Sequence, residues 1–185
     1  VNEIRLVREQ LERVARQGPR ATAVFVSVLA VVTTASPLLA GHLAPTGSFA
    51  SVPGYWTQTA AWLADQPGGG KALLLPGSSF GTYVWGEPRD EPMQYLAEEP
   101  WAVRNAVPLS PAGTIRMLDA VEARLAQGHG SAGLAPYLSR SGVRYLVVRN
   151  DLARSTDVPD PVLVQQALES SPGIAKVAQF GPPVG

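Results

Sequence analysis

The chain has 185 residues, which is enough for one compact domain with flanking segments but short for two domains. Its 15 lysines and arginines balance 15 aspartates and glutamates, so nothing in the charge favours nucleic acid as a partner. Cysteine is absent and the two histidines, His42 and His129, lie far apart, so neither a disulfide framework nor a zinc site is expected.

The first 20 residues are predicted to form an amphipathic helix. Charged residues occupy one helical face, and the opposite apolar stripe comprises Ile4, Val7, Leu11 and Val14. Gly18-Pro19 ends this pattern, because proline does not continue a helix. We expect this helix to lie in the cytoplasm beside a membrane.

Residues 21–41 contain no charged side chain, and a helix of about 20 residues matches the roughly 30 Å of a hydrocarbon core. We therefore predict a transmembrane helix there. Five arginines precede this segment and the next basic residue is Lys71, so the positive-inside rule places everything after Gly41 outside the plasma membrane. A cleavable signal peptide and a buried core helix are the alternatives. The long charged helix before the segment speaks against the first, and the lack of a polar face against the second.

Residues 42–54 are rich in Gly, Pro, Ser and Ala and are predicted to be a linker. The remaining residues, 55–185, are predicted to form an extracytoplasmic α/β domain. Its expected helices are 55–66, 111–127, a shorter one after Ser131, and 160–169. Its expected strands are 71–76, 143–149 and 174–180, with a short strand at 82–85 inside a long ordered loop over 77–111. Strands separated by helices imply a small, mainly parallel sheet with flanking helices.

The run Gly77-Ser78-Ser79-Phe80-Gly81 fits the G-x-S-x-G nucleophile elbow of serine hydrolases. Asp119 and His129 follow in the order that such a triad needs. An elbow requires a helix directly after the serine, however, and the glycine and prolines between 82 and 92 do not favour one. We therefore interpret the run as a glycine turn and keep a membrane-anchored serine hydrolase as the less favoured alternative.

The loop over 77–111 combines aromatic side chains with carboxylates and an arginine, which is the composition of a sugar-facing surface. The candidate residues for binding a glycan or for organising the loop are Trp85, Asp90, Glu91, Trp101 and Arg104. We expect them to converge near the carboxyl ends of the strands, with Arg104 paired to Asp90 or Glu91. The alternative is that the two tryptophans only pack the loop onto the sheet.

Four runs of sequence carry a resemblance to a known family. They are PGYWTQTAAWLAD, LLLPGSSFGTYVWGEPRDEPMQYLAEEPWAVRNAVPLSP, EARLAQGHGSAGLAPYLSRSGVRYLVVRNDL and SSPGIAKVAQFGP. Through them, residues 37–183 resemble the actinobacterial α-(1→3)-arabinofuranosyltransferases, and the chain resembles an internal fragment of such an enzyme.

The resemblance implies a large membrane enzyme that transfers arabinofuranose from a polyprenyl-phosphate donor to the arabinan of arabinogalactan and lipoarabinomannan. The family's catalytic acid is expected outside this chain, so no catalytic residue, metal site or cofactor is assigned here. Membrane lipid, the rest of the enzyme and a cell-wall glycan acceptor are the implied partners. A non-catalytic glycan-binding or scaffold module anchored in the membrane remains the principal alternative.

Overall fold

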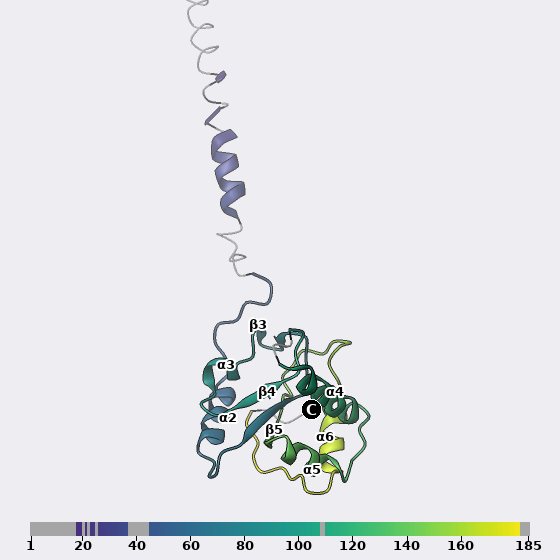
Figure 1. Ribbon diagram of the computed structural model, residues 1–185. Coiled ribbons are helices and arrows are strands. Elements are labelled where there is room, and N and C mark those ends of the chain that lie inside the picture. The colour runs from purple at the N-terminus through teal and green to yellow at the C-terminus, as the bar shows by residue number, and fades with distance from the viewer. Residues whose placement is uncertain are drawn as a thin grey trace, which may run out of the picture. The chain divides into compact units, whose positions relative to one another are not determined.

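The computed structural model describes residues 18–19, 21, 23–24, 26–36, 45–107 and 110–181 (Figure 1). The chain divides into two units, 1–46 and 47–185, and each is considered by itself. The second unit contains the sheet and both hydrophobic clusters.

The first unit is helical over 26–36. None of the helices in the described part of the chain is both long and apolar enough to cross a membrane. The predicted transmembrane helix over 21–41 is therefore wrong. The predicted amphipathic helix falls almost entirely on 1–17, outside the described residues.

The second unit is built on a three-stranded parallel sheet with the order β4-β1-β5. The central strand β1 (Lys71–Leu75) pairs with β4 (Trp101–Val103) on one side and β5 (Val143–Val148) on the other. The strand predictions for 71–76 and 143–149 are confirmed to within one residue. The three strands of this sheet are parallel because a crossover of helices or loops separates each from the next, as the alternation of elements in the sequence indicates.

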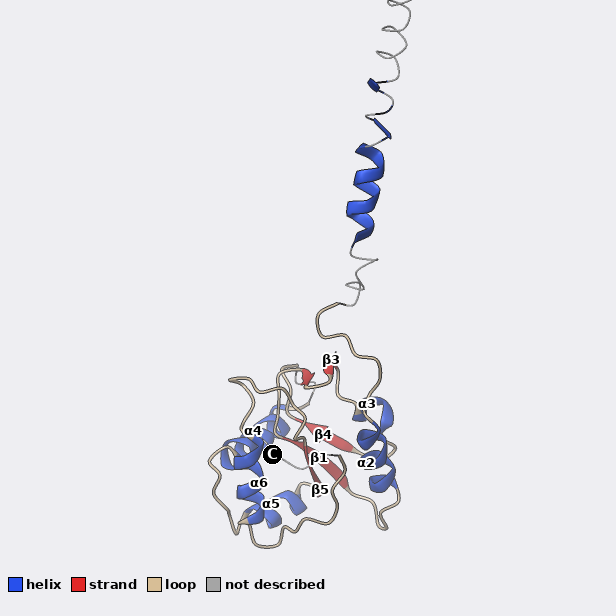
Figure 2. Cartoon of the chain, turned by 180° about the vertical axis from the view of Figure 1, so that it is seen from behind, coloured by secondary structure: helices blue, strands red, loops and turns tan. Residues whose placement is uncertain are grey.

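Helices cover both faces of this sheet, as Figures 1 and 2 show. On one face lie α2 (Gly54–Ala64) and the short α3 (Met93–Leu96). On the other lie α4 (Ala112–Leu125), α5 (Leu134–Arg140) and α6 (Pro161–Glu169). Alternate residues of β1 enter different clusters: Leu73 and Leu75 pack with α4, α5 and α6, whereas Leu74 packs with α2. The α/β class with a small parallel sheet is thus confirmed.

Two parts of the domain differ from the sequence-based expectation. The region 77–111 is not one loop, since it contains the antiparallel hairpin of β2 (Gly81–Tyr83) and β3 (Gly86–Arg89), then α3 and β4. The predicted last strand at 174–180 is not formed. It fails because the only backbone hydrogen bond made there by the described residues runs from the Ile174 N–H back to the Ser171 carbonyl, so the segment has no sheet partner.

Candidate functional site

Several buried polar side chains of the domain lie near the carboxyl ends of the three parallel strands. The chain passes from β1 to β4 on one side and later returns to β5 on the other side of β1. Open α/β sheets bind their ligands at such a reversal of strand order, outside the carboxyl ends of the strands. The segments that leave these ends are 76–79, 104–107 and 149–152.

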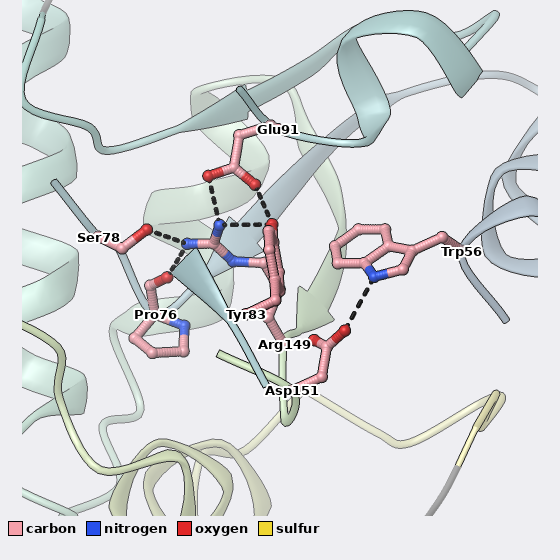
Figure 3. Close-up of polar contacts among 7 residues, drawn as sticks. All are labelled: Trp56, Pro76, Ser78, Tyr83, Glu91, Arg149 and Asp151. Carbon is pink, nitrogen blue, oxygen red and sulfur yellow. Dashed lines mark hydrogen bonds and ion pairs between the residues drawn. The ribbon is translucent and has the colours of Figure 1, made fainter. Parts of the chain in front are cut away.

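Arg149, the first residue after β5, is the centre of a buried polar cluster (Figure 3). Its Nη1 lies 2.5 Å from Glu91 Oε1, and its Nη2 donates to the Pro76 carbonyl oxygen and lies 3.5 Å from Ser78 Oγ. The Tyr83 hydroxyl donates to Glu91 Oε2 at 2.5 Å. The side chains of Arg149 and Glu91 are 0% and 5% exposed, so this guanidinium ties the hairpin region to the sheet without facing solvent.

Electrostatic coupling in this cluster is strong because its side chains are buried. Burial alone would lower the pKa of Arg149, but the Glu91 carboxylate and the Tyr83 hydroxyl raise it above its ordinary value. Burial also raises the pKa of Tyr83, with an opposing contribution from Arg149. With both pKa values raised, Arg149 keeps its charge and the Tyr83 hydroxyl keeps its proton at neutral pH, so their contacts act as an anchor.

Asp151 forms a second anchor, two residues after Arg149. Its Oδ2 accepts hydrogen bonds from Tyr55 Oη at 2.8 Å, from Trp56 Nε1 at 2.9 Å and from Trp85 Nε1 at 2.9 Å. Burial, followed by the hydrogen bond to Asp151, raises the pKa of Tyr55. One carboxylate oxygen thus joins α2, the hairpin and the end of β5.

Glu122 of α4 is the acidic residue of this region whose buried carboxyl group is only partly hydrogen-bonded. Its Oε2 is buried and has no hydrogen-bond partner among the described residues. Burial raises the pKa of Glu122, whereas the Gly77 backbone N–H and the nearby Arg149 and Arg104 oppose this shift. Glu122 thus places a buried carboxyl group beside the ends of β1 and β4, with one oxygen that no described residue hydrogen-bonds.

The five residues predicted for the site do not meet at one place. Glu91 is buried in the Arg149 cluster, and Trp85 stacks on Tyr83 with ring centroids 4.8 Å apart. Asp90 is exposed, and Trp101 is half-buried on β4.

The predicted pairing of Arg104 with Asp90 or Glu91 is wrong. Arg104 Nε donates to Asp119 Oδ1 of α4 at 2.6 Å instead. The reason is topological: Arg104 follows β4, and α4 passes beside the end of that strand, whereas Glu91 is already occupied by Arg149.

The serine hydrolase arrangement is not assembled. Asp119, which a triad would require beside His129, pairs with Arg104. Hydrogen bonds from Ser155 and then from Ser79 lower the pKa of Asp157 to about 2. No hydrogen bond joins His129 to Ser79 among the residues that the structure describes. The two glycines of the motif have packing roles instead, since an added Cβ would lie 2.9 Å from the Arg104 carbonyl oxygen at Gly77 and 2.7 Å from the Asp90 carbonyl oxygen at Gly81.

Sequence reasoning missed four residues that organise this region. Most of their contacts join residues that are distant in sequence, as for Arg149 and Glu91, which are 58 positions apart, although Tyr83 and Glu91 are only 8 positions apart. The missed residues are Tyr83, Glu122, Arg149 and Asp151. The position of Arg149 directly after an apolar strand was the one local signal. In the described ranges, no group of three or more acidic or histidine side chains could hold a metal ion.

Comparison with known proteins identifies similar chains. The model of the family described as "Alpha-(1->3)-arabinofuranosyltransferase, N-terminal GT-C domain" matches residues 2–185. The chain is 43% identical over 171 residues to the alpha-(1->3)-arabinofuranosyltransferase of Mycobacterium tuberculosis, and 46% identical over 166 residues to that of Mycolicibacterium smegmatis. These matches cover 90% and 88% of the chain, but only 12% of each relative's length.

The fold is also similar to a solved structure. The chain superimposes with a TM-score of 0.77 and 48% identity on the cryo-EM structure of the arabinofuranosyltransferase AftD from Mycobacteria, over 88% of this chain and 12% of that one. A mutant of the same enzyme gives a TM-score of 0.77 over 90% of this chain and 13% of that one.

Proposed function

Because the chain belongs to the alpha-(1->3)-arabinofuranosyltransferase family, we propose that it is one domain of a polyprenyl-phosphate-arabinose-dependent arabinofuranosyltransferase that builds cell-wall arabinan. The observation that carries this proposal is the family match over residues 2–185. The chain spans 12% of the length of the curated relatives, so the transfer activity is assigned to the longer enzyme.

Within that enzyme, the domain has a non-catalytic, supporting role. The contacts around Arg149 and Asp151 support this assignment, because both side chains bind other residues of the same domain: Arg149 pairs with Glu91, and Asp151 accepts a hydrogen bond from Trp85. Trp85 and Glu91 are loop-organising residues in this proposal, through Asp151 and Arg149 respectively. Arg104 has the corresponding role between β4 and α4. Asp90 is exposed and Trp101 is half-buried, and we assign these two candidates to contact with a glycan acceptor.

A transfer assay tests both parts of the proposal. Membranes that carry the full-length enzyme are supplied with a polyprenyl-phosphate arabinofuranose donor and a short arabinan acceptor, and elongation of the acceptor is followed by mass spectrometry. We expect elongation by the full-length enzyme and none by the 185-residue chain. Elongation by the short chain would refute its non-catalytic role, and a full-length enzyme that elongates no arabinan would refute the substrate assignment.

We also place the domain outside the cytoplasm, beside the plasma membrane. A polyprenyl-linked donor is confined to the membrane, and cell-wall arabinan is assembled beyond it, so the acceptor must be reached from the outer side. The chain lacks cysteine, which suits labelling. We expect a cysteine introduced at the exposed Ala123 of the full-length enzyme to react with a membrane-impermeant maleimide in intact cells, above the signal of the unsubstituted enzyme. Labelling only after lysis would place the domain in the cytoplasm.

A further inference from the structure

The strand β5 has the sequence of an interior strand but lies at the edge of the sheet. Its residues VRYLVV form an almost continuous apolar run, which is typical of a parallel strand buried on both faces and flanked by two others. Yet Tyr145, Leu146, Val147 and Val148 are only half-buried, and β5 pairs with β1 alone. Figure 2 shows β5 as an outer strand of the sheet.

The outer edge of β5 also has unpaired backbone groups. The Arg149 N–H donates to the Leu75 carbonyl oxygen at 2.6 Å, which fixes which residues of β5 face β1. Because the direction alternates along the regular part of the strand, the N–H and C=O groups of Leu146 and Val148 point away from β1. None of these groups takes part in a hydrogen bond with any residue that the structure describes.

A cavity of about 560 Å³ follows this edge. One wall is β5 along its full length, and the opposite wall is the segment 173–180. Apolar side chains from both faces of the sheet line it, among them Trp62 of α2 and Leu168 of α6. In the segment 175–180, too, the described residues make no backbone hydrogen bond, so both long walls present unpaired N–H and C=O groups.

We propose that this cavity is the docking site of an extended segment from another part of the same enzyme, which pairs with β5 as the fourth strand of the sheet. Only an extended peptide matches N–H and C=O groups that repeat every second residue along a strand. Its alternate side chains would cover the two half-buried faces, Tyr145 and Val147 on one side and Leu146 and Val148 on the other.

The source of the segment follows from the length of the relatives. The matched region is 12% of each relative, so most of the polypeptide in these enzymes lies outside it and is tethered to it. Tethering gives such a segment a high effective concentration at the cavity. A second copy of the chain is a poorer fit, since the segment 173–180 stands in the way of edge-to-edge pairing. The inference rests on the longer enzyme of the proposed function but not on its substrate.

Hydrogen exchange tests the pairing without any assay of transfer. The backbone amides of Leu146 and Val148 are compared in the 185-residue chain and in the full-length enzyme. We expect exchange at least about 100-fold slower in the full-length enzyme, because docking pairs these amides. Fast exchange in both proteins would overturn the proposal. Slow exchange in both would overturn it as well, since it would mean that 174–180 closes on β5 by itself.

A matched pair of variants separates pairing from general burial. Leu146→Pro and Leu146→Ala both lose the leucine side chain, but only the first loses an outward-facing N–H, at a position where an edge strand tolerates proline. In the full-length enzyme we expect Leu146→Ala to keep the slow exchange of the Val148 amide and Leu146→Pro to lose it. Equal behaviour of the two variants would overturn the pairing. Should Leu146→Pro not fold, the comparison of the two wild-type proteins still decides the question.

Photo-crosslinking identifies the part of the enzyme from which the docked segment comes. Lys176, an exposed residue on the outer wall, is replaced by p-benzoylphenylalanine in the full-length enzyme. We expect crosslinks to a peptide of the same polypeptide outside these 185 residues. Crosslinks confined to residues 1–185, to a second copy or to another protein would overturn the assignment.

Discussion

Arg149 Nη1 lies 2.5 Å from Glu91 Oε1, and this ion pair joins the end of the edge strand β5 to the residues that lead into α3. Both side chains are almost completely removed from water. A buried pair of this kind holds a structure together chiefly because the loss of either partner leaves a buried charge uncompensated. The hairpin region therefore depends on a contact across 58 positions of sequence.

Removal of the negative charge of Glu91 should lower the stability of the fold. We expect Glu91→Gln to lower the free energy of unfolding by about 3–5 kcal/mol, because the buried Arg149 guanidinium loses its counter-charge. Urea denaturation of the 185-residue chain measures this change. Glu98→Gln, at an exposed position, is the matched control and should stay within about 0.5 kcal/mol of wild type. A double variant Glu91→Leu/Arg149→Met should lose less than the single one, and a larger loss would contradict the argument.

The close approach of two strand ends predicts a role for Gly77. A Cβ added there would lie 2.9 Å from the Arg104 carbonyl oxygen and 3.0 Å from Arg104 Cβ, so Gly77→Ala must displace the end of β4. We expect a loss of about 1–3 kcal/mol in the free energy of unfolding. Gly113→Ala is the control, since an added Cβ meets nothing within 4 Å and alanine is the better helix former in α4. Equal stability of the two variants would contradict this explanation of the glycine.

The elements that could be predicted are those with local signals. The helix α6 was expected from Asp160-Pro161, and Asp160 Oδ1 does accept a hydrogen bond from the Val162 N–H at 2.9 Å at the start of Pro161–Glu169. By contrast, β4 spans three residues beside a proline, too short for any periodicity. It exists because it pairs with β1, a contact that sequence patterns do not contain.

The site was harder to predict than the fold for the same physical reason. The composition of the region 77–111 indicated aromatic and charged candidate residues, but composition does not specify the partners of those residues. The carboxylate of Glu91 contacts an arginine after β5 rather than the nearer Arg104. The prediction for the apolar stretch 21–41 was wrong for a different reason. The lack of charged residues alone did not establish a helix long enough to cross a membrane.

The raised pKa of Glu122 predicts a specific pH dependence. Because burial lifts its pKa in the folded state above the ordinary 4.5, the folded protein binds the proton more tightly than the unfolded chain does. Stability must then fall as pH rises from about 4.5 through the higher folded pKa, and the loss persists above it. We expect Glu122→Gln to abolish this fall and to be more stable than wild type at neutral pH.

Urea denaturation between pH 4 and 8 measures this effect, with Glu98→Gln as the control at an exposed position. The Glu98→Gln control should follow the wild-type profile, because it leaves the buried Glu122 carboxyl unchanged. A Glu122→Gln variant that is less stable than wild type at pH 7 would mean that the charged form is stabilised in the fold, contrary to this interpretation.

Substitution of the half-buried Trp101 distinguishes a packing role of this residue from a glycan-binding role. It pairs with Ala72 across the sheet and packs at the margin of the cluster formed with α2. We expect Trp101→Ala to lower the free energy of unfolding by about 2 kcal/mol, less than the 3–5 kcal/mol of a fully buried aromatic side chain, because part of the ring faces solvent. Tyr95→Ala, at a side chain that is 58% exposed, is the control and should change stability by less than about 0.5 kcal/mol. Titration of both variants of the full-length enzyme with a short arabinan completes the test. If Trp101→Ala keeps its stability but loses affinity for the acceptor, the residue contacts sugar and the packing role is refuted.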